Sequence, residues 1–74
     1  MKLPVLKPKR VILMFQKAGF YIDHQTGSHV TLLHNDGRRI TIPKHNRDLK
    51  KGTLKNILRQ ARLSVKKFIE LKIF

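Results

Sequence analysis

The sequence predicts a small α+β domain with the element order α-β-β-β-α and a short additional helix near the C-terminus. Apolar residues recur at helical spacing towards both ends of the chain, whereas in the middle they alternate with polar residues at the period of strands. An Asp-Gly pair, Asp36 and Gly37, stands between two alternating runs, which is a strong signal for a β-hairpin. The 74 residues are 41% hydrophobic, so we expect one small core and a single domain over residues 1–74.

The first helix is expected from about Pro8 to Ala18. Pro8 suits the first turn of a helix, where its missing N–H would have no helical partner in any case. Val11, Phe15 and Ala18 then recur at helical spacing, and Gly19 fits a C-terminal cap. This segment therefore offers one apolar stripe to a core.

Three antiparallel strands in a meander are expected between residues 20 and 43. The alternation in FYID, HVTLLH and RRITIP predicts as inward-facing residues Phe20, Ile22, Val30, Leu32, Ile40 and Ile42. The opposite face, open to solvent, then carries His29, Thr31, Arg39 and Thr41. Pro43 ends the third strand because it has no N–H to donate to a ladder.

A second main helix follows a polar, basic loop. Its apolar stripe at i, i+3, i+4 and i+7 consists of Leu54, Ile57, Leu58 and Ala61. Thr53 precedes the stripe and is the expected N-cap, and Ser64 is expected to cap a short third helix. The two main helices would cover the apolar face of the sheet. This order of elements is that of the double-stranded-RNA-binding fold, although a shared topology does not establish function.

The charge of the chain indicates a polyanionic partner. Seventeen Lys and Arg residues face four Asp and Glu residues, which gives a net charge of +13. Nucleic acid is the first candidate, followed by an acidic protein and an anionic membrane surface; the alternative is an ordinary soluble basic protein. The chain has no cysteine and no apolar run long enough for a membrane span. Its first residues do not resemble a secretory signal, so we expect a cytoplasmic protein.

Basic residues are concentrated around the second main helix. Lys50 and Lys51 stand at its expected N-terminus, where free N–H groups and the helix dipole favour a phosphate. If the helix continues, one stripe opposite the apolar face would be formed by Lys55, Arg59, Arg62 and Lys66. The stripe suits phosphates or an anionic partner, and the alternative is an ordinary solvated helix face.

Four histidines are the remaining chemical candidates, namely His24, His29, His34 and His45. Their spacing lacks helical ligand pairs and the chain lacks cysteine ligands, so we expect no metal site and no cofactor. His24 and His34 fall at strand ends and are read as polar edge residues. His45, beside Lys44, either contacts a phosphate or is simply solvated.

His29 is the strongest candidate for chemistry. The inward register of Val30 and Leu32 places it on the open face, and Gly27 removes side-chain bulk beside it. An exposed histidine can exchange protons near physiological pH, although most exposed histidines are inert. The four acidic residues are too scattered for a two-metal nuclease, so an RNA-cleaving enzyme built on this chain would use the ribose 2′-OH as nucleophile.

The central part of the sequence resembles the HicA (YcfA-like) family of toxins from type II toxin–antitoxin systems. The resemblance rests on GSHVTLLHNDGRRITIPKHNRDLKKGTLKNILRQARLS, extended upstream by KAGFYIDHQTGSH, and covers roughly Lys9 to Leu63. It implies a double-stranded-RNA-binding-like fold and a metal-independent mRNA interferase, an endoribonuclease that cleaves mRNA and arrests translation. The catalytic histidine of the Gly-Ser-His motif corresponds to His29.

The resemblance also implies partners and supporting residues. A HicB-type antitoxin would bind the toxin and block its active site, giving a toxin–antitoxin hetero-oligomer, whereas the toxin alone would be monomeric. Gly27 and Ser28 would support His29. From the basic surface itself we expect Arg39 and Lys44 to flank the scissile phosphate. The full set of expected RNA contacts is Arg39, Lys44, His45, Lys50, Lys51, Lys55 and Arg59.

Two features depart from the family pattern. Arg62 stands where relatives often carry a glycine that ends the helix, so the helix could continue past it. The tail SVKKFIELKIF is more basic than the acidic tail expected for the family. The C-terminus could therefore contact an antitoxin differently. Two other functions remain open, a non-catalytic module that binds double-stranded RNA or other nucleic acid and a degenerate toxin that only contacts proteins.

Overall fold

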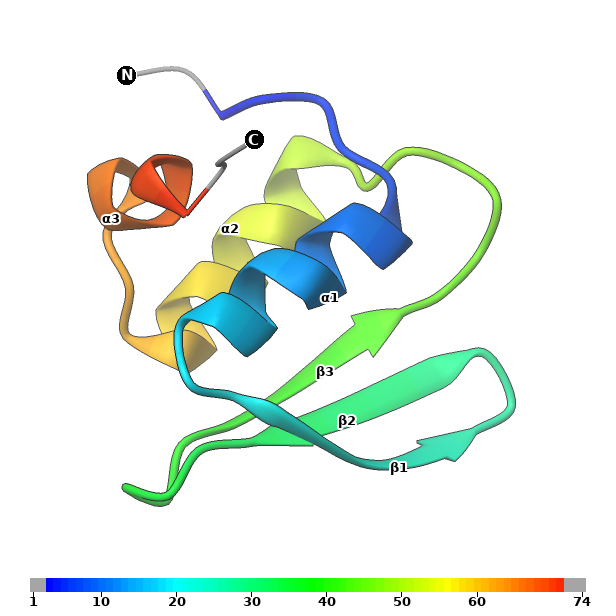
Figure 1. The fold of residues 1–74 in the computed structure, drawn as a ribbon. Coiled ribbons are helices and arrows are strands. Elements are labelled where there is room, and N and C mark those ends of the chain that lie inside the picture. The colour runs from blue at the N-terminus through cyan, green and yellow to red at the C-terminus, as the bar shows by residue number, and fades with distance from the viewer. Residues whose placement is uncertain (1–2, 72–74) are drawn as a thin grey trace.

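The computed structural model describes residues 3–71 and confirms the α-β-β-β-α arrangement. Its elements are α1 (Pro8–Lys17), β1 (Tyr21–Thr26), β2 (His29–Leu33), β3 (Arg39–Pro43), α2 (Lys51–Ala61) and α3 (Val65–Glu70). The strands form one antiparallel sheet in the order β1-β2-β3. Helices α1 and α2 lie on the same side of this sheet, and after α2 the chain turns back so that α3 lies on the side of the helices away from the sheet (Figure 1).

The core lies between the two main helices and the sheet. Fully buried side chains include Phe15 from α1, Leu32 from β2 and Phe68 from α3. The segment before α1 adds Leu3 and Leu6 to this core, a contribution that the sequence pattern did not predict. The same segment is tied to the loop before α2, because the N–H of Leu49 donates to the carbonyl of Leu6 at 2.9 Å.

The predicted alternation of the sheet is wrong at two positions. Ile22 is 48% exposed, because a β-bulge lies between Ile22 and His24 and twists this edge strand out of register. Thr31 was expected on the open face but is buried. It lies on the central strand directly between His24 of β1 and Thr41 of β3, and these neighbours shield its small side chain.

Both ends of α2 differ from expectation. The helix begins at Lys51 with Lys50 as N-cap, so Thr53 lies inside the first turn and does not cap it. Arg62 adopts a left-handed conformation with φ of 56° and ends the helix. The expected continuous basic stripe is therefore interrupted, and Lys66 belongs to α3. Ser64 does cap α3, as predicted, by accepting a hydrogen bond from the N–H of Lys67 at 3.1 Å.

The turn between β2 and β3, hereafter the far turn (residues 34–38), is closed by bonds among its own residues. The predicted hairpin at Asp36 and Gly37 is confirmed, with the N–H of Gly37 donating to the carbonyl of His34 at 2.9 Å. Arg38 Nε donates to the Asp36 carboxylate at 2.8 Å, and Arg38 Nη1 donates to the carbonyl of Ala61 at the end of α2. The far turn is thus joined to the opposite layer of the fold.

Candidate nucleic-acid interface

The turn between β1 and β2, hereafter the hairpin tip (residues 26–29), carries the Gly-Ser-His sequence. Thr26 pairs with His29, so Gly27 and Ser28 form a two-residue turn. Gly27 has φ of +59°, and a positive φ at the first of two turn positions is typical of a type II′ turn, which favours glycine there. Nothing lies within 4 Å of the position that a Cβ on Gly27 would take. The turn therefore explains this glycine, and the space beside it is open.

His29 is exposed on the side of the sheet that faces away from the helices. Its strand neighbour Val30 is buried against the core, and the alternation of β2 places His29 on the other face, as predicted. Across the ladder His29 lies opposite Pro43, the last residue of β3. An imidazole in this position is accessible to a large substrate on the open sheet face.

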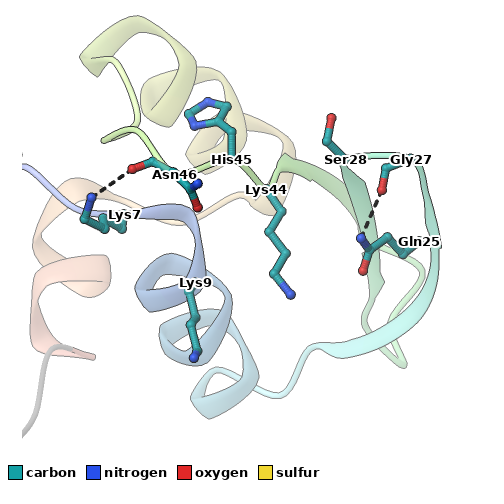
Figure 2. A pocket seen from close by; sticks show the side chains of 8 residues that line it. All are labelled: Lys7, Lys9, Gln25, Gly27, Ser28, Lys44, His45 and Asn46. Atoms are coloured by element: carbon teal, nitrogen blue, oxygen red, sulfur yellow. Dashed lines mark hydrogen bonds between the residues drawn. The ribbon is translucent and has the colours of Figure 1, made fainter.

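Lys44 extends the pairing one step beyond β3. Its N–H donates to the carbonyl of Ser28, which holds the start of the following loop against the hairpin tip. This bond brings Lys44, His45 and Asn46 next to Ser28 although they are far apart in the sequence. Figure 2 shows the Lys44 side chain reaching into the gap between the hairpin and α1.

A hollow of about 650 Å³ lies between the hairpin tip, this loop and the start of α1. We call it the basic hollow; its lining residues are Lys7, Lys9, Gln25, Gly27, Ser28, Lys44, His45 and Asn46 (Figure 2). Among the described residues that line it, three are lysines and none is acidic. Lys7 Nζ donates to the carbonyl of Asn46 at 2.8 Å, so the chain before α1 forms one wall. The concentration of one sign of charge in a concave surface attracts anions.

His45 is oriented by the backbone of its own loop. The N–H of Arg47 donates to His45 Nδ1 at 3.1 Å, so the neutral ring carries its proton on Nε2. His45 and Asn46 also line a second hollow of about 540 Å³, which extends over the loop to Lys50 and Thr53 at the start of α2. The loop between β3 and α2 thus contributes to two hollows.

The structure brings together some of the predicted residues and separates others. Gly27, Ser28, Lys44 and His45 meet at the basic hollow, and Lys50 lines the second hollow. Lys51, Lys55 and Arg59 are exposed along α2. His29 adjoins Ser28 in the chain but lines neither of these two hollows.

Arg39 is on the same sheet face as His29 but at the other end of the strands. It pairs with Leu33, whereas His29 pairs with Pro43, four residues further along β3. At about 3.3 Å per residue the separation along the strand is about 13 Å. The Arg39 side chain therefore begins well along the strand from His29, and the flanking of one phosphate by Arg39 and Lys44 stays a prediction.

Lys7 and Lys9 were missed by sequence reasoning. The run LKPKR that contains them predicts only the start of a helix. A signal was present, because this run is basic and has no acidic neighbour, but nothing in it indicated which part of the chain it would contact. Lys7 contacts the backbone carbonyl of Asn46, and a contact to the backbone cannot be recognised from the side chains in the sequence.

Two acidic side chains outside this region have close partners. His24 Nδ1 lies 2.7 Å from the carboxylate of its neighbour Asp23. The side-chain hydrogen bonds from Arg38 lower the pKa of Asp36 below its usual value. Among residues 3–71, no three side chains of the metal-binding types His, Asp and Glu come close enough to share an ion. Within the same residues, no helix has the length and apolar character needed to cross a membrane.

Comparison with protein families identifies a matching family. A family model described as "HicA toxin of bacterial toxin-antitoxin" matches residues 8–63, which run from the start of α1 to just beyond the end of α2. The matched part includes the hairpin tip and seven of the eight residues that line the basic hollow, all except Lys7. No curated protein matches the chain.

Proposed function

The chain belongs to the HicA family of bacterial toxin–antitoxin toxins, and from this we propose that it is an mRNA interferase, a metal-independent endoribonuclease that cleaves mRNA in the cytoplasm and arrests translation. The observation that carries the proposal is the hairpin tip. There an exposed histidine, His29, adjoins a basic hollow without acidic residues among its described lining. A nuclease needs both features, an acid–base group and cations that hold phosphates.

The proposed reaction is a transfer within the RNA strand. The ribose 2′-oxygen attacks the neighbouring phosphorus while a base removes its proton, and the bond to the 5′-oxygen breaks as an acid supplies a proton to that oxygen. The products are a 2′,3′-cyclic phosphate and a 5′-hydroxyl, and no water is consumed in this step. His29 moves one of the two protons, and a positioned acid–base group of this kind contributes about 10²–10⁴-fold to the rate.

The cations of the same region stabilise the negative charge that develops on the phosphate during the reaction. Lys44 directly follows Pro43, the residue that pairs with His29, and its N–H bonds to Ser28, the residue before His29. The exposed cations Lys50, Lys51, Lys55 and Arg59 are placed to bind phosphates further along the RNA. Stabilisation of negative charge by fixed cations is the usual second contribution to such a reaction.

The antitoxin partner follows from the same family membership. We infer that a HicB-type antitoxin binds the toxin in a hetero-oligomer and covers the hairpin tip, so that RNA cannot reach His29. An acidic surface on that partner would complement the net charge of +13.

A non-catalytic nucleic-acid-binding module is the alternative. One observation favours it, because among residues 3–71 the His29 ring has no hydrogen-bond partner to orient it. The alternative uses the same basic surface and predicts salt-sensitive binding without product strands.

One cleavage experiment decides between the two. Wild type and His29→Ala are incubated with an unstructured mRNA in the presence of a chelator, and product ends are analysed for the cyclic phosphate. We expect His29→Ala to lose about 10²–10⁴-fold in rate, with unchanged RNA affinity and thermal stability. His24→Ala, which removes an exposed histidine from the same hairpin, is the matched control and should cleave normally. Cleavage by His29→Ala at the wild-type rate would refute the catalytic assignment, and binding without cleavage by wild type would favour the alternative.

A further inference from the structure

We propose that the basic hollow is a subsite for a single-stranded RNA, holding a nucleotide and its phosphate beyond the scissile bond, and that the strand reaches it by crossing the hairpin tip. The inference deepens the proposed function and rests on it for the position of the scissile bond. It assigns Lys9, together with Lys7, a role in substrate binding that the resemblance to the family did not suggest.

The first argument is the convergence of positive charge from separate parts of the chain. Lys7 precedes α1, Lys9 lies in the first turn of α1, and Lys44 follows β3, yet all three line one hollow. Within residues 3–71, the Lys9 and Lys44 ammonium groups have neither a carboxylate nor a hydrogen-bond partner. Like charges around one concave surface repel one another, and a bound anion relieves that repulsion. The hollow is therefore suited to a phosphate.

The second argument concerns the groups between the lysines. Amides from Gln25 and Asn46, the hydroxyl of Ser28 and the Nε2–H of His45 supply donors and acceptors of the kind that bind ribose and base edges. A volume of about 650 Å³ lies within the usual range for small-ligand sites, which is roughly 300–1,000 Å³. A nucleotide of a single strand can enter such a hollow, whereas a duplex is bound across its grooves by a more extended surface.

The third argument is the path between the two sides of the hairpin. Ser28 lines the hollow and the next residue, His29, stands on the open sheet face, so one residue step separates the subsite from the proposed acid–base group. Gly27, the other residue of the two-residue turn, also lines the hollow, and the space that a Cβ on it would occupy is open. A strand passing over the tip would therefore meet little side-chain bulk at Gly27.

The subsite predicts a dependence on substrate length that general charge attraction does not. The cleavage rate, as kcat/KM, is measured for a series of RNA oligonucleotides from a dinucleotide upward, with wild type, Lys9→Ala and Lys67→Ala. Lys67 is an exposed lysine on α3, so Lys67→Ala makes the same change in net charge away from the hollow. We expect Lys9→Ala to cleave the dinucleotide like wild type and to lose several-fold in kcat/KM only on longer strands, while Lys67→Ala matches wild type throughout.

Binding gives a second and independent readout. The affinity for a single-stranded RNA is measured against salt with His29→Ala as the background, so that substrate is not consumed. Loss of one phosphate contact should reduce the slope of log K against log salt by about 0.7 for a single strand. The double variant His29→Ala with Lys9→Ala should show this reduction for single strands and not for a duplex of the same sequence, and Lys9→Arg in place of Lys9→Ala should restore the slope.

The possible failures are distinct. An equal loss on all lengths, no loss on any, or the same loss with Lys67→Ala would each overturn the subsite while leaving the nuclease proposal intact. An equal slope change on duplex RNA would overturn the single-strand assignment. If wild type cleaves no RNA, the proposed function fails, and the salt slope of Lys9→Ala then decides by itself whether the hollow binds a strand.

Discussion

The two turns of the sheet use polar residues in opposite ways. At the far turn, the charged groups are bound within the protein: Arg38 bonds to Asp36 and to the end of α2, and its guanidinium lies 5.0 Å from the Phe20 ring. At the hairpin tip, the His29 ring is exposed. Lys44, next to the tip, forms hydrogen bonds within the described residues only through its backbone. Both turns adjoin the central strand β2, and each contains one histidine, His29 at the hairpin tip and His34 at the far turn. Charge that is satisfied internally supports the fold, whereas charge that is left exposed is available to a ligand.

The largest stability effect should come from a glycine beside the far turn. Gly19 has φ of +99°, and a Cβ there would stand 2.8 Å from Nε2 of His34. The His34 ring cannot move aside easily, because it packs edge-on against Phe20 with centroids 5.0 Å apart. Gly19→Ala should therefore destabilise the fold by about 2–4 kcal/mol, through left-handed strain and overpacking together. Thermal unfolding measures the loss.

The matched variant for this comparison is Gly27→Ala at the hairpin tip. It carries positive-φ strain of about 1–2 kcal/mol but meets no neighbouring atom within 4 Å. The thermal unfolding midpoint of Gly27→Ala should fall less than that of Gly19→Ala. Equal losses for the two variants would show that the contact with His34 contributes nothing.

Arg38 should give the next largest effect. Its side chain is 17% exposed and donates to both a carboxylate and a helix-terminal carbonyl. Because hydrogen bonds of charged groups contribute about 1.5–3 kcal/mol, Arg38→Ala should lower the free energy of unfolding by about that amount. Denaturant titration measures the change. Arg38→Lys should recover little, because an ammonium cannot reproduce the forked contacts of a guanidinium.

The adjacent residue supplies the control for Arg38. Arg39→Ala removes the same charge from an exposed position and should change stability by less than about 0.5 kcal/mol. A similar loss in both variants would mean that net charge, and not the contacts of the far turn, determines the result.

The far turn also shows which features could be read from the sequence. Asp36 and Gly37 predicted the hairpin because turn chemistry is local, and alternation placed His29 outside and Val30 inside for the same reason. The partners of Arg38 were not predictable, because Ala61 lies 23 residues away and presents only its backbone carbonyl. Long-range contacts to the backbone have no side-chain signature.

The same reasoning explains the errors at the edge strand and at the candidate site. A two-residue period cannot reveal a bulge, so Ile22 was placed in the core although it is exposed. The sequence identified Lys44 and His45 as candidate RNA contacts, but the wall formed by Lys7 and Lys9 depends on how the first segment lies on a distant loop. Local chemistry was predictable, and the shape of the hollow was not.

A smaller, stabilising effect is expected at the end of α2. The N–H groups of Arg62 and Leu63 donate to the carbonyls of Arg59 and Leu58, at 3.2 and 3.0 Å, and this cap requires the left-handed conformation of Arg62. The corresponding cap of α1 has a glycine, Gly19, in that conformation. Arg62→Gly should raise the free energy of unfolding by about 1 kcal/mol, measured by denaturant titration. A destabilised Arg62→Gly would show that the arginine side chain contributes more than its backbone strain costs.

The smallest effect is expected from the Asp36 carboxylate, which is exposed to solvent. The hydrogen bonds from Arg38 lower its pKa in the folded state below the unfolded value. Its contribution to stability is therefore fully present above the unfolded pKa, which is about 3.9, and is lost as the pH falls through the folded pKa. Melting midpoints measured from pH 7 downward should converge for wild type and Asp36→Asn below about pH 4. The control Asp48→Asn also removes one carboxylate, from the loop after β3. If the difference in melting midpoint between wild type and Asp36→Asn stays constant into strong acid, the ion pair of Asp36 with Arg38 does not support the far turn. The contrast with the hairpin tip then rests on the contacts that Arg38 and His34 make with groups other than this carboxylate.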